Sequence, residues 1–161
     1  MDMYQKGAKI VYPLYGAGVI EDIEQKEIDG ELQTYYVLNI PVGNLKIMIS
    51  AAKAESQRVR LIHTGEEIKA FLVNAAQILM PDNWNQRYKE NMERIKSGEL
   101  SQVAVVFYNL LLRERERGLS TAEKKMMTTA KQIILSEVIL SFDFERAEAE
   151  EFLDNLFLQE E

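Results

Sequence analysis

The chain of 161 residues is 47% hydrophobic and 28% charged and has a formal net charge of -7, a composition that can bury a core and that excludes wholesale disorder. It contains no cysteine and one histidine, His63, which excludes disulfide scaffolds, thiol catalysis and metal sites rich in cysteine or histidine. No apolar run reaches the roughly 18 residues of a membrane span, and residues 1–13 contain no apolar signal segment, so we expect a cytoplasmic protein without a membrane partner.

The first 60 residues are predicted to form strands. They contain five of the eight glycines and two of the three prolines, together with many Val, Ile and Tyr side chains. Asp29-Gly30 stands between two strand-like runs and is typical of a tight hairpin turn. The predicted strands are residues 9–13, 19–28, 31–40 and 45–50. Short strands joined by tight turns favour a small antiparallel β-barrel of the Tudor or SH3 type.

Residues 64–161 are predicted to form helices, because they are rich in Leu, Met, Glu, Lys and Ala, with Gly and Pro at the ends of periodic segments. The signals of helix starts are the capping boxes Thr64–Glu67 and Ser120–Glu123 and the turn Pro81-Asp82-Asn83. Residues 101–117 place their apolar side chains on one helical face. Four or five helices in an all-α bundle are expected.

The predicted fold is therefore α+β, with residues 1–55 forming the barrel and residues 64–161 the helical domain. Charge is unevenly distributed within the second domain. Residues 83–131 carry ten basic and six acidic side chains, whereas residues 132–161 carry one basic and nine acidic side chains. The net charge argues against a simple basic nucleic-acid binder, but the basic middle of the helical domain could still meet phosphates.

Trp84 is the only tryptophan, and it falls in the first turn of a predicted helix. Helical spacing places Arg87, Tyr88, Asn91 and Arg94 on the same stripe. An aromatic ring in such surroundings can stack on a base or wedge into an opened base step while the cations hold phosphates. The alternative is that Trp84 packs between the domains or in the helical core, and the residues alone favour it because tryptophan is usually well buried.

A second candidate site combines the cationic run of Arg113, Arg115 and Arg117 with Lys124 and Lys125 of the next predicted helix. These cations could cluster at one end of the bundle, where the backbone N–H groups of the helix start would add phosphate donors. The alternative is a solvated face of alternating charge, which is the commoner outcome.

The remaining features favour structural interpretations. Gly16-Ala17-Gly18 is interpreted as a strand turn, since no Gly-Lys-Ser/Thr follows. His63 is expected to have a structural or capping role. The carboxylates of Glu148–Glu151 and Asp154 indicate a helix surface, because no histidine or cysteine accompanies them. No catalytic set emerges, so we expect no enzyme activity, no metal and no cofactor.

Three motifs occur in one order along nearly the whole chain. They are Lys6-Gly7 with Val11-Tyr12-Pro13 and Gly16–Val19, then Asn83–Asn91 with Ser97-Gly98-Glu99, and then Arg115–Lys124. Together they resemble the CarD/CdnL family of bacterial transcription regulators, and the two long motifs of the helical half make the resemblance specific.

The resemblance implies a non-enzymatic factor with two domains. Its Tudor-like domain, similar to the polymerase-interacting domain of the transcription-repair coupling factor, would dock on the RNA polymerase β subunit. Its helical domain would bind promoter DNA, largely without sequence specificity, and wedge Trp84 into the minor groove at the upstream edge of the bubble, which would stabilise the open complex. The implied protein is a monomer in the cytoplasm, associated with the nucleoid. The implied DNA-binding residues are Trp84, Arg87, Lys89, Arg117, Lys124 and Lys125, and the implied polymerase-binding residues are Lys26 and Met48.

Two positions on the sheet depart from the family pattern, which has Arg at both. Lys26 keeps the charge but loses the forked geometry, and Met48 keeps neither. A second cation expected near Thr129 is also absent. The alternative function is a protein–protein adaptor without DNA binding, whose barrel binds a peptide or a strand edge.

Overall fold

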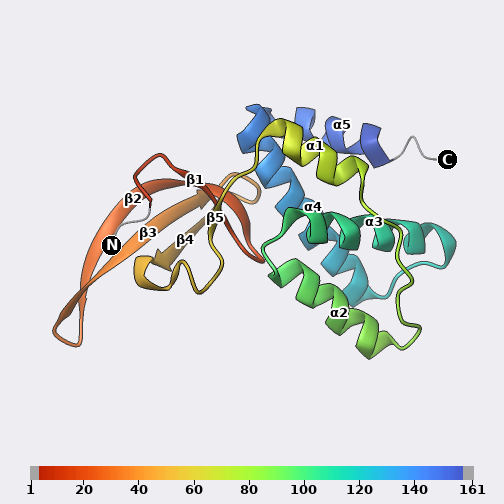
Figure 1. The fold of residues 1–161 in the computed structure, drawn as a ribbon, viewed down its shortest axis with the longest axis horizontal. Helices are drawn as coiled ribbons and strands as arrows, with labels where there is room; N and C mark the ends of the chain where they lie inside the picture. Colours follow the sequence, from red (N-terminus) through yellow and green to blue (C-terminus); the bar gives the residue numbers. More distant parts are fainter. Residues whose placement is uncertain (1–3, 158–161) are drawn as a thin grey trace.

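The computed structural model describes residues 4–157, in which an antiparallel sheet is followed by helices (Figure 1). The sheet order is β4-β3-β2-β1-β5. The strands are β1 (Lys9–Tyr12), β2 (Gly16–Ile28), β3 (Glu31–Ile40), β4 (Leu45–Ser50) and β5 (Arg60–Leu61). The α+β prediction is confirmed.

The hairpin of β2 and β3 is the longest part of the sheet, and its turn is the predicted Asp29-Gly30. Both residues have positive φ, 52° and 79°, as a two-residue turn between twisted strands requires. The register pairs Ile28 with Glu31 across this turn. The local sequence signal predicted this turn and strand β3 correctly. The interpretation of Gly16-Ala17-Gly18 as a turn is wrong, because these residues begin β2 and pair with β1, and the turn lies at residues 13–15.

A closed barrel is not confirmed. Strand β4 pairs only with β3, and β5 pairs only with β1, so in residues 4–157 these two strands are the edges of an open sheet. Strand β5 is two residues long, which is too short to close a barrel, and the 3₁₀ turn Ala51–Lys53 follows β4 instead of a further strand. Strand β5 also lies beyond residue 55, the boundary expected for the sheet domain.

Two groups of buried side chains form the interior. The first lies under one face of the sheet and includes Ile10, Ile20, Tyr36, Leu38, Ile40 and Ile49. The second lies among the helices and includes Ile68, Leu72, Ile95, Leu110, Ile134 and Leu153. The division into separate domains remains a prediction, but each half of the chain has apolar packing of its own.

The helices are α1 (Gly65–Val73), α2 (Trp84–Lys96), α3 (Leu100–Glu116), α4 (Thr121–Phe142) and α5 (Arg146–Phe157). The capping box at Thr64 forms with both of its hydrogen bonds, and the Ser120 side chain accepts from the Glu123 N–H. Helix α4 contacts α3 and α5 and also reaches strand β2. Within residues 4–157, no helix is both long enough and apolar enough to cross a membrane.

Candidate nucleic-acid interface

Trp84 lies on the surface at the first residue of α2, where 41% of it is exposed. Its ring stacks on Tyr88 with centroids 5.3 Å apart and planes 20° apart. Its indole Nε1–H donates to the Ser120 Oγ at 3.1 Å. The alternative of a core position for Trp84 is therefore wrong, and the exposed ring has a fixed orientation.

Ser120 connects Trp84 to a buried ion pair. The Ser120 hydroxyl donates to Oε1 of Glu123 at 3.1 Å, and Glu123 is 2% exposed. Arg87 donates to this carboxylate from Nε at 2.7 Å and from Nη2 at 3.2 Å. These hydrogen bonds join the start of α4 to α2 next to the tryptophan. They hold Ser120, and through Ser120 the indole ring, in a fixed position.

Arg87 differs from its expected role as an exposed phosphate contact. It is 3% exposed, and its Nη1 donates to the carbonyl oxygens of Pro81 at 3.1 Å and Asp82 at 3.0 Å. With its nitrogens engaged in this way and its side chain covered, Arg87 has no face for DNA in this conformation. The geometry favours a role in positioning Trp84.

Electrostatics reinforces the ion pair. The hydrogen bonds from Arg87, and then its charge, hold the pKa of Glu123 below the ordinary value of 4.5, although burial acts in the opposite direction. The same hydrogen bonds raise the pKa of Arg87. Both groups are therefore charged at neutral pH, so the ion pair next to Trp84 is present under these conditions.

Four of the predicted DNA-binding cations are exposed: Lys89, Arg117, Lys124 and Lys125. Lys124 and Lys125 are the fourth and fifth residues of α4, which Ser120 caps. Arg117 is the C-terminal cap of α3, and Lys89 lies on α2. Arg117, Lys124 and Lys125 thus lie within five residues of Ser120, which hydrogen-bonds Trp84, and Lys89 lies five residues after Trp84 on the same helix.

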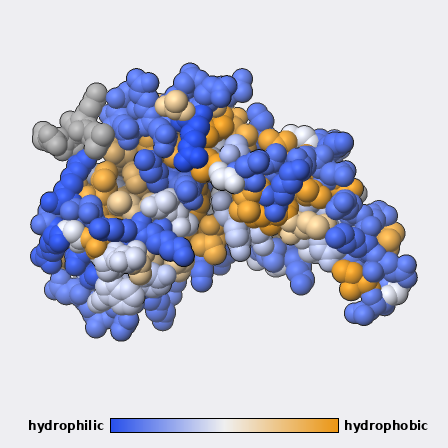
Figure 2. All heavy atoms as spheres, turned by 180° about the vertical axis from the view of Figure 1, so that it is seen from behind, coloured by the Kyte–Doolittle hydropathy of each residue, from blue (hydrophilic) through white to orange (hydrophobic). Residues whose placement is uncertain are grey.

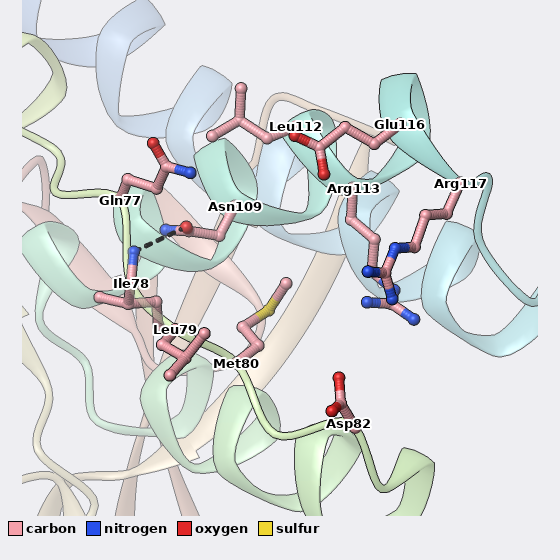
Figure 3. A pocket seen from close by; sticks show the side chains of 10 residues that line it. All are labelled: Gln77, Ile78, Leu79, Met80, Asp82, Asn109, Leu112, Arg113, Glu116 and Arg117. Carbon is pink, nitrogen blue, oxygen red and sulfur yellow. Dashed lines mark hydrogen bonds between the residues drawn. The ribbon is translucent and has the colours of Figure 1, made fainter.

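The segment before α2 is held by a residue that the sequence did not reveal. Asn109, 3% exposed on α3, accepts from the Ile78 N–H at 2.9 Å and donates to the Ala76 carbonyl at 2.9 Å (Figure 3). Figure 3 also shows the side chains of Arg113 and Arg117 side by side, with Asp82 below them. A lone polar residue on the apolar face of a predicted helix was the available signal, but its partners are about 30 residues away in the chain.

Lys26 and Met48, predicted to contact polymerase, lie together on the exposed face of the sheet. The Lys26 Nζ lies 3.5 Å from the Met48 Sδ, and 40% of Met48 is exposed. Apolar side chains are also exposed at the tip of the hairpin, where Ile28 is 42% and Leu32 67% exposed (Figure 2, lower right). The sheet thus presents a surface with both apolar and basic side chains, formed by residues more than 30 positions before Trp84 in the sequence.

His63 takes part in structural contacts. Its Nδ1 lies 3.6 Å from the Glu67 carboxylate, and its ring meets the edge of Phe71 with centroids 4.9 Å apart. No group of three or more potential metal ligands occurs in the described range, residues 4–157. The carboxylates of α5 form no such cluster there.

Comparison with known proteins gives two family matches. The family model described as "CarD-like/TRCF RID domain" matches residues 4–62, and the model described as "CarD, C-terminal domain" matches residues 68–154. A protein of Bacillus subtilis (strain 168) named "Putative transcription factor YdeB" is 38% identical over 140 residues, which cover 84% of this chain and 90% of that protein.

Proposed function

The chain belongs to the CarD family of transcription factors, which are not enzymes, and we propose that it stabilises the open promoter complex by holding RNA polymerase with its sheet and DNA with its helices. The observation that carries the proposal is Trp84, a ring that is 41% exposed and yet fixed by Tyr88 and Ser120. A prearranged ring loses little freedom when it enters a groove, so more of its contact energy is available for binding.

The proposed step at DNA is a wedge. Trp84 enters the minor groove at the upstream edge of the bubble and occupies the space that the bases need to restack. Lys89, Arg117, Lys124 and Lys125 hold the neighbouring phosphates, without a base-specific contact. A net charge of -7 makes the affinity for free DNA weak, and anchoring on polymerase compensates by raising the local concentration of the ring.

The proposed anchor is the sheet. The matched polymerase-interacting domain of the transcription-repair coupling factor supports RNA polymerase as the partner, and we propose its β subunit. Strand β4 is an open edge with Met48 exposed beside Lys26, which suits pairing with a strand of the partner. We propose that the protein acts as a monomer, in the cytoplasm and at the nucleoid.

Gel shifts on fork-junction promoter DNA, with and without core polymerase, test this proposal against the adaptor alternative. We expect the protein to join the DNA complex only when polymerase is present, and Met48→Glu to abolish this recruitment by placing a carboxylate on the contact face. Leu79→Ser, a change at a residue 99% exposed on a different segment, is the control and should have no effect. Binding to polymerase that is unaffected by DNA and by Trp84→Ala would favour the adaptor.

A further inference from the structure

One side chain joins the sheet to two parts of the helical half. Arg60 of β5 donates from Nη1 and Nη2 to the two carboxylate oxygens of Glu137, each at 2.9 Å. Its Nε donates to the carbonyl oxygen of Gly98, between α2 and α3, at 2.8 Å. The planar guanidinium therefore connects β5, helix α4 and the loop that follows α2 in one fixed geometry.

Glu137 depends on this arrangement. Glu137 is 0% exposed in the C-terminal half of α4, and its Oε2 also accepts the backbone N–H of His63 at 2.8 Å. Both donors belong to the segment that leaves the sheet. If the sheet moved away from α4, a buried carboxylate would lose its partners, which is strongly unfavourable. The ion pair therefore opposes any change in the angle between the sheet and α4.

A second contact lies next to the first. The neighbouring Ser136 accepts the N–H of Ala17 on Oγ at 2.8 Å, and a Cβ on Gly16 would lie 2.7 Å from the same oxygen. Strand β2 thus begins in direct contact with α4. Ser141 donates to the carbonyl oxygen of His63 at 2.8 Å, one turn further along the helix. We call the contacts of Arg60, Glu137, Ser136 and Ala17 the inter-module clamp.

Helix α4 carries the effect of the clamp to the DNA-contacting end. Glu137 lies on the half of α4 that meets the sheet, and Ser120, which binds Trp84, caps the opposite end. The 16 residues between them belong to one uninterrupted helix, and the two residues are about 26 Å apart along its axis. The position of Trp84 relative to the sheet is therefore set by two anchored ends of a single helix.

We propose that Arg60 and Glu137 are positioning residues that fix the distance and angle between the polymerase-binding sheet and Trp84. This inference rests on the proposed function. When the sheet is docked, the inter-module clamp confines Trp84 to one place on the DNA instead of spreading its local concentration over many places. Loss of the clamp would leave both contact surfaces intact and weaken their joint action.

A distance measurement on the full chain tests the clamp directly. The sequence has no cysteine, so Lys53→Cys and Glu151→Cys, at exposed positions of the two halves, accept two spin labels selectively. We expect one narrow distance distribution in the otherwise unchanged chain and a broad or shifted one with Arg60→Ala, Arg60→Lys or Glu137→Gln. Glu123→Gln, which breaks an Arg–Glu pair within the helical half whose carboxylate is also buried, is the matched control and should leave the distribution narrow.

Function is measured on the same clamp variants without labels. Arg60→Lys keeps the charge but lacks the planar fork that binds the Glu137 carboxylate and the Gly98 carbonyl together. We expect it to shorten the open-complex lifetime while co-purification with polymerase is retained. The proposal would be overturned if folded clamp variants kept the narrow distance distribution. It would also be overturned if a variant with a broad distribution still lengthened the open-complex lifetime as much as the wild-type protein does. If the wild-type chain itself leaves the lifetime unchanged, the proposed function fails, and the distance distributions still decide whether the clamp fixes the geometry.

Discussion

Trp84 shows how a side chain can be exposed and still be held in one orientation. The stack on Tyr88 and the hydrogen bond to Ser120 hold a ring that has no cover on its outer side. Arg87 and Glu123 stabilise this arrangement from below, although the sequence pattern had placed Arg87 among the phosphate contacts. Only the long-range contact between α2 and α4 distinguishes a positioning arginine from a DNA-binding one.

Replacing the ring should leave the fold nearly intact. Trp84→Ala removes one stacked pair and one surface hydrogen bond, so we expect the free energy of unfolding to fall by about 1 kcal/mol. Phe107→Ala, in the helical core, is the control and should cost about 3–5 kcal/mol. Urea unfolding of both variants provides the comparison, and an equally large loss for Trp84→Ala would mean that the ring supports the core.

The ion pair behind Trp84 should make stability depend on acid. Because Arg87 lowers the pKa of Glu123 in the folded chain, this stabilisation is fully present above the unfolded value near 4.5 and is lost as the pH falls through the folded pKa. We expect Glu123→Gln to lose roughly 3–5 kcal/mol at neutral pH and to show a flatter decline on acidification. Urea midpoints between about pH 3 and about pH 7 measure this, with the exposed Glu93→Gln as control. Parallel pH curves for wild type and Glu123→Gln would contradict the assignment.

The exposed lysines of α4 should act through phosphate alone. Lys124→Ala and Lys125→Ala are each expected to reduce the dependence of DNA affinity on log salt by about one unit, with equal weakening on different promoters. The measurement is a salt titration of the polymerase–promoter complex. Arg87→Ala should instead destabilise the fold, because Arg87 is buried. A loss confined to one promoter sequence would point to base recognition by these lysines.

At the scale of the elements, two glycines of the β2–β3 hairpin allow backbone strain and steric clash to be measured separately. Gly30→Ala meets no atom within 4 Å but keeps a φ of +79°, so we expect a loss of about 1 kcal/mol from backbone strain alone. Gly18→Ala would place Cβ 2.6 Å from the carbonyl oxygen of Asn39 on β3, which forces the two strands apart. Thermal midpoints should therefore fall much further for Gly18→Ala, and equal midpoints would contradict this interpretation.

The elements that sequence could predict are those with local causes. Asp29-Gly30 sets the hairpin within four residues, and the caps at Thr64 and Ser120 bond to the residue three positions later. The closure of the sheet could not be predicted in this way, because it depends on how far β5 extends along β1, some 50 residues earlier. The pairing of Arg60 with Glu137 spans 77 residues, and no local pattern announces it.

In the whole molecule, a sheet is followed by a set of helices (Figure 1). Each has a core of its own, and the ion pair of Arg60 with the buried Glu137 joins them. The exposed face of the sheet carries Lys26 and Met48, and the far end of the bundle carries Trp84. This separation suits the proposed function, in which one surface binds polymerase while the other meets DNA. The proposed contact with DNA is compatible with a net charge of -7, since only one end of the molecule needs to be basic.

The most direct test is the lifetime of open promoter complexes after a competitor is added, measured with wild-type protein and with Trp84→Ala at equal occupancy of polymerase. Wild-type protein should lengthen the lifetime. Since stacking on a base is worth about 1–3 kcal/mol, the lifetime with Trp84→Ala should be shorter than with wild-type protein by a factor of about five or more. Trp84→Ala should still co-purify with polymerase and remain folded. An unchanged lifetime with the folded variant would contradict the wedge, and a wild-type protein without any effect on lifetime would contradict open-complex stabilisation altogether.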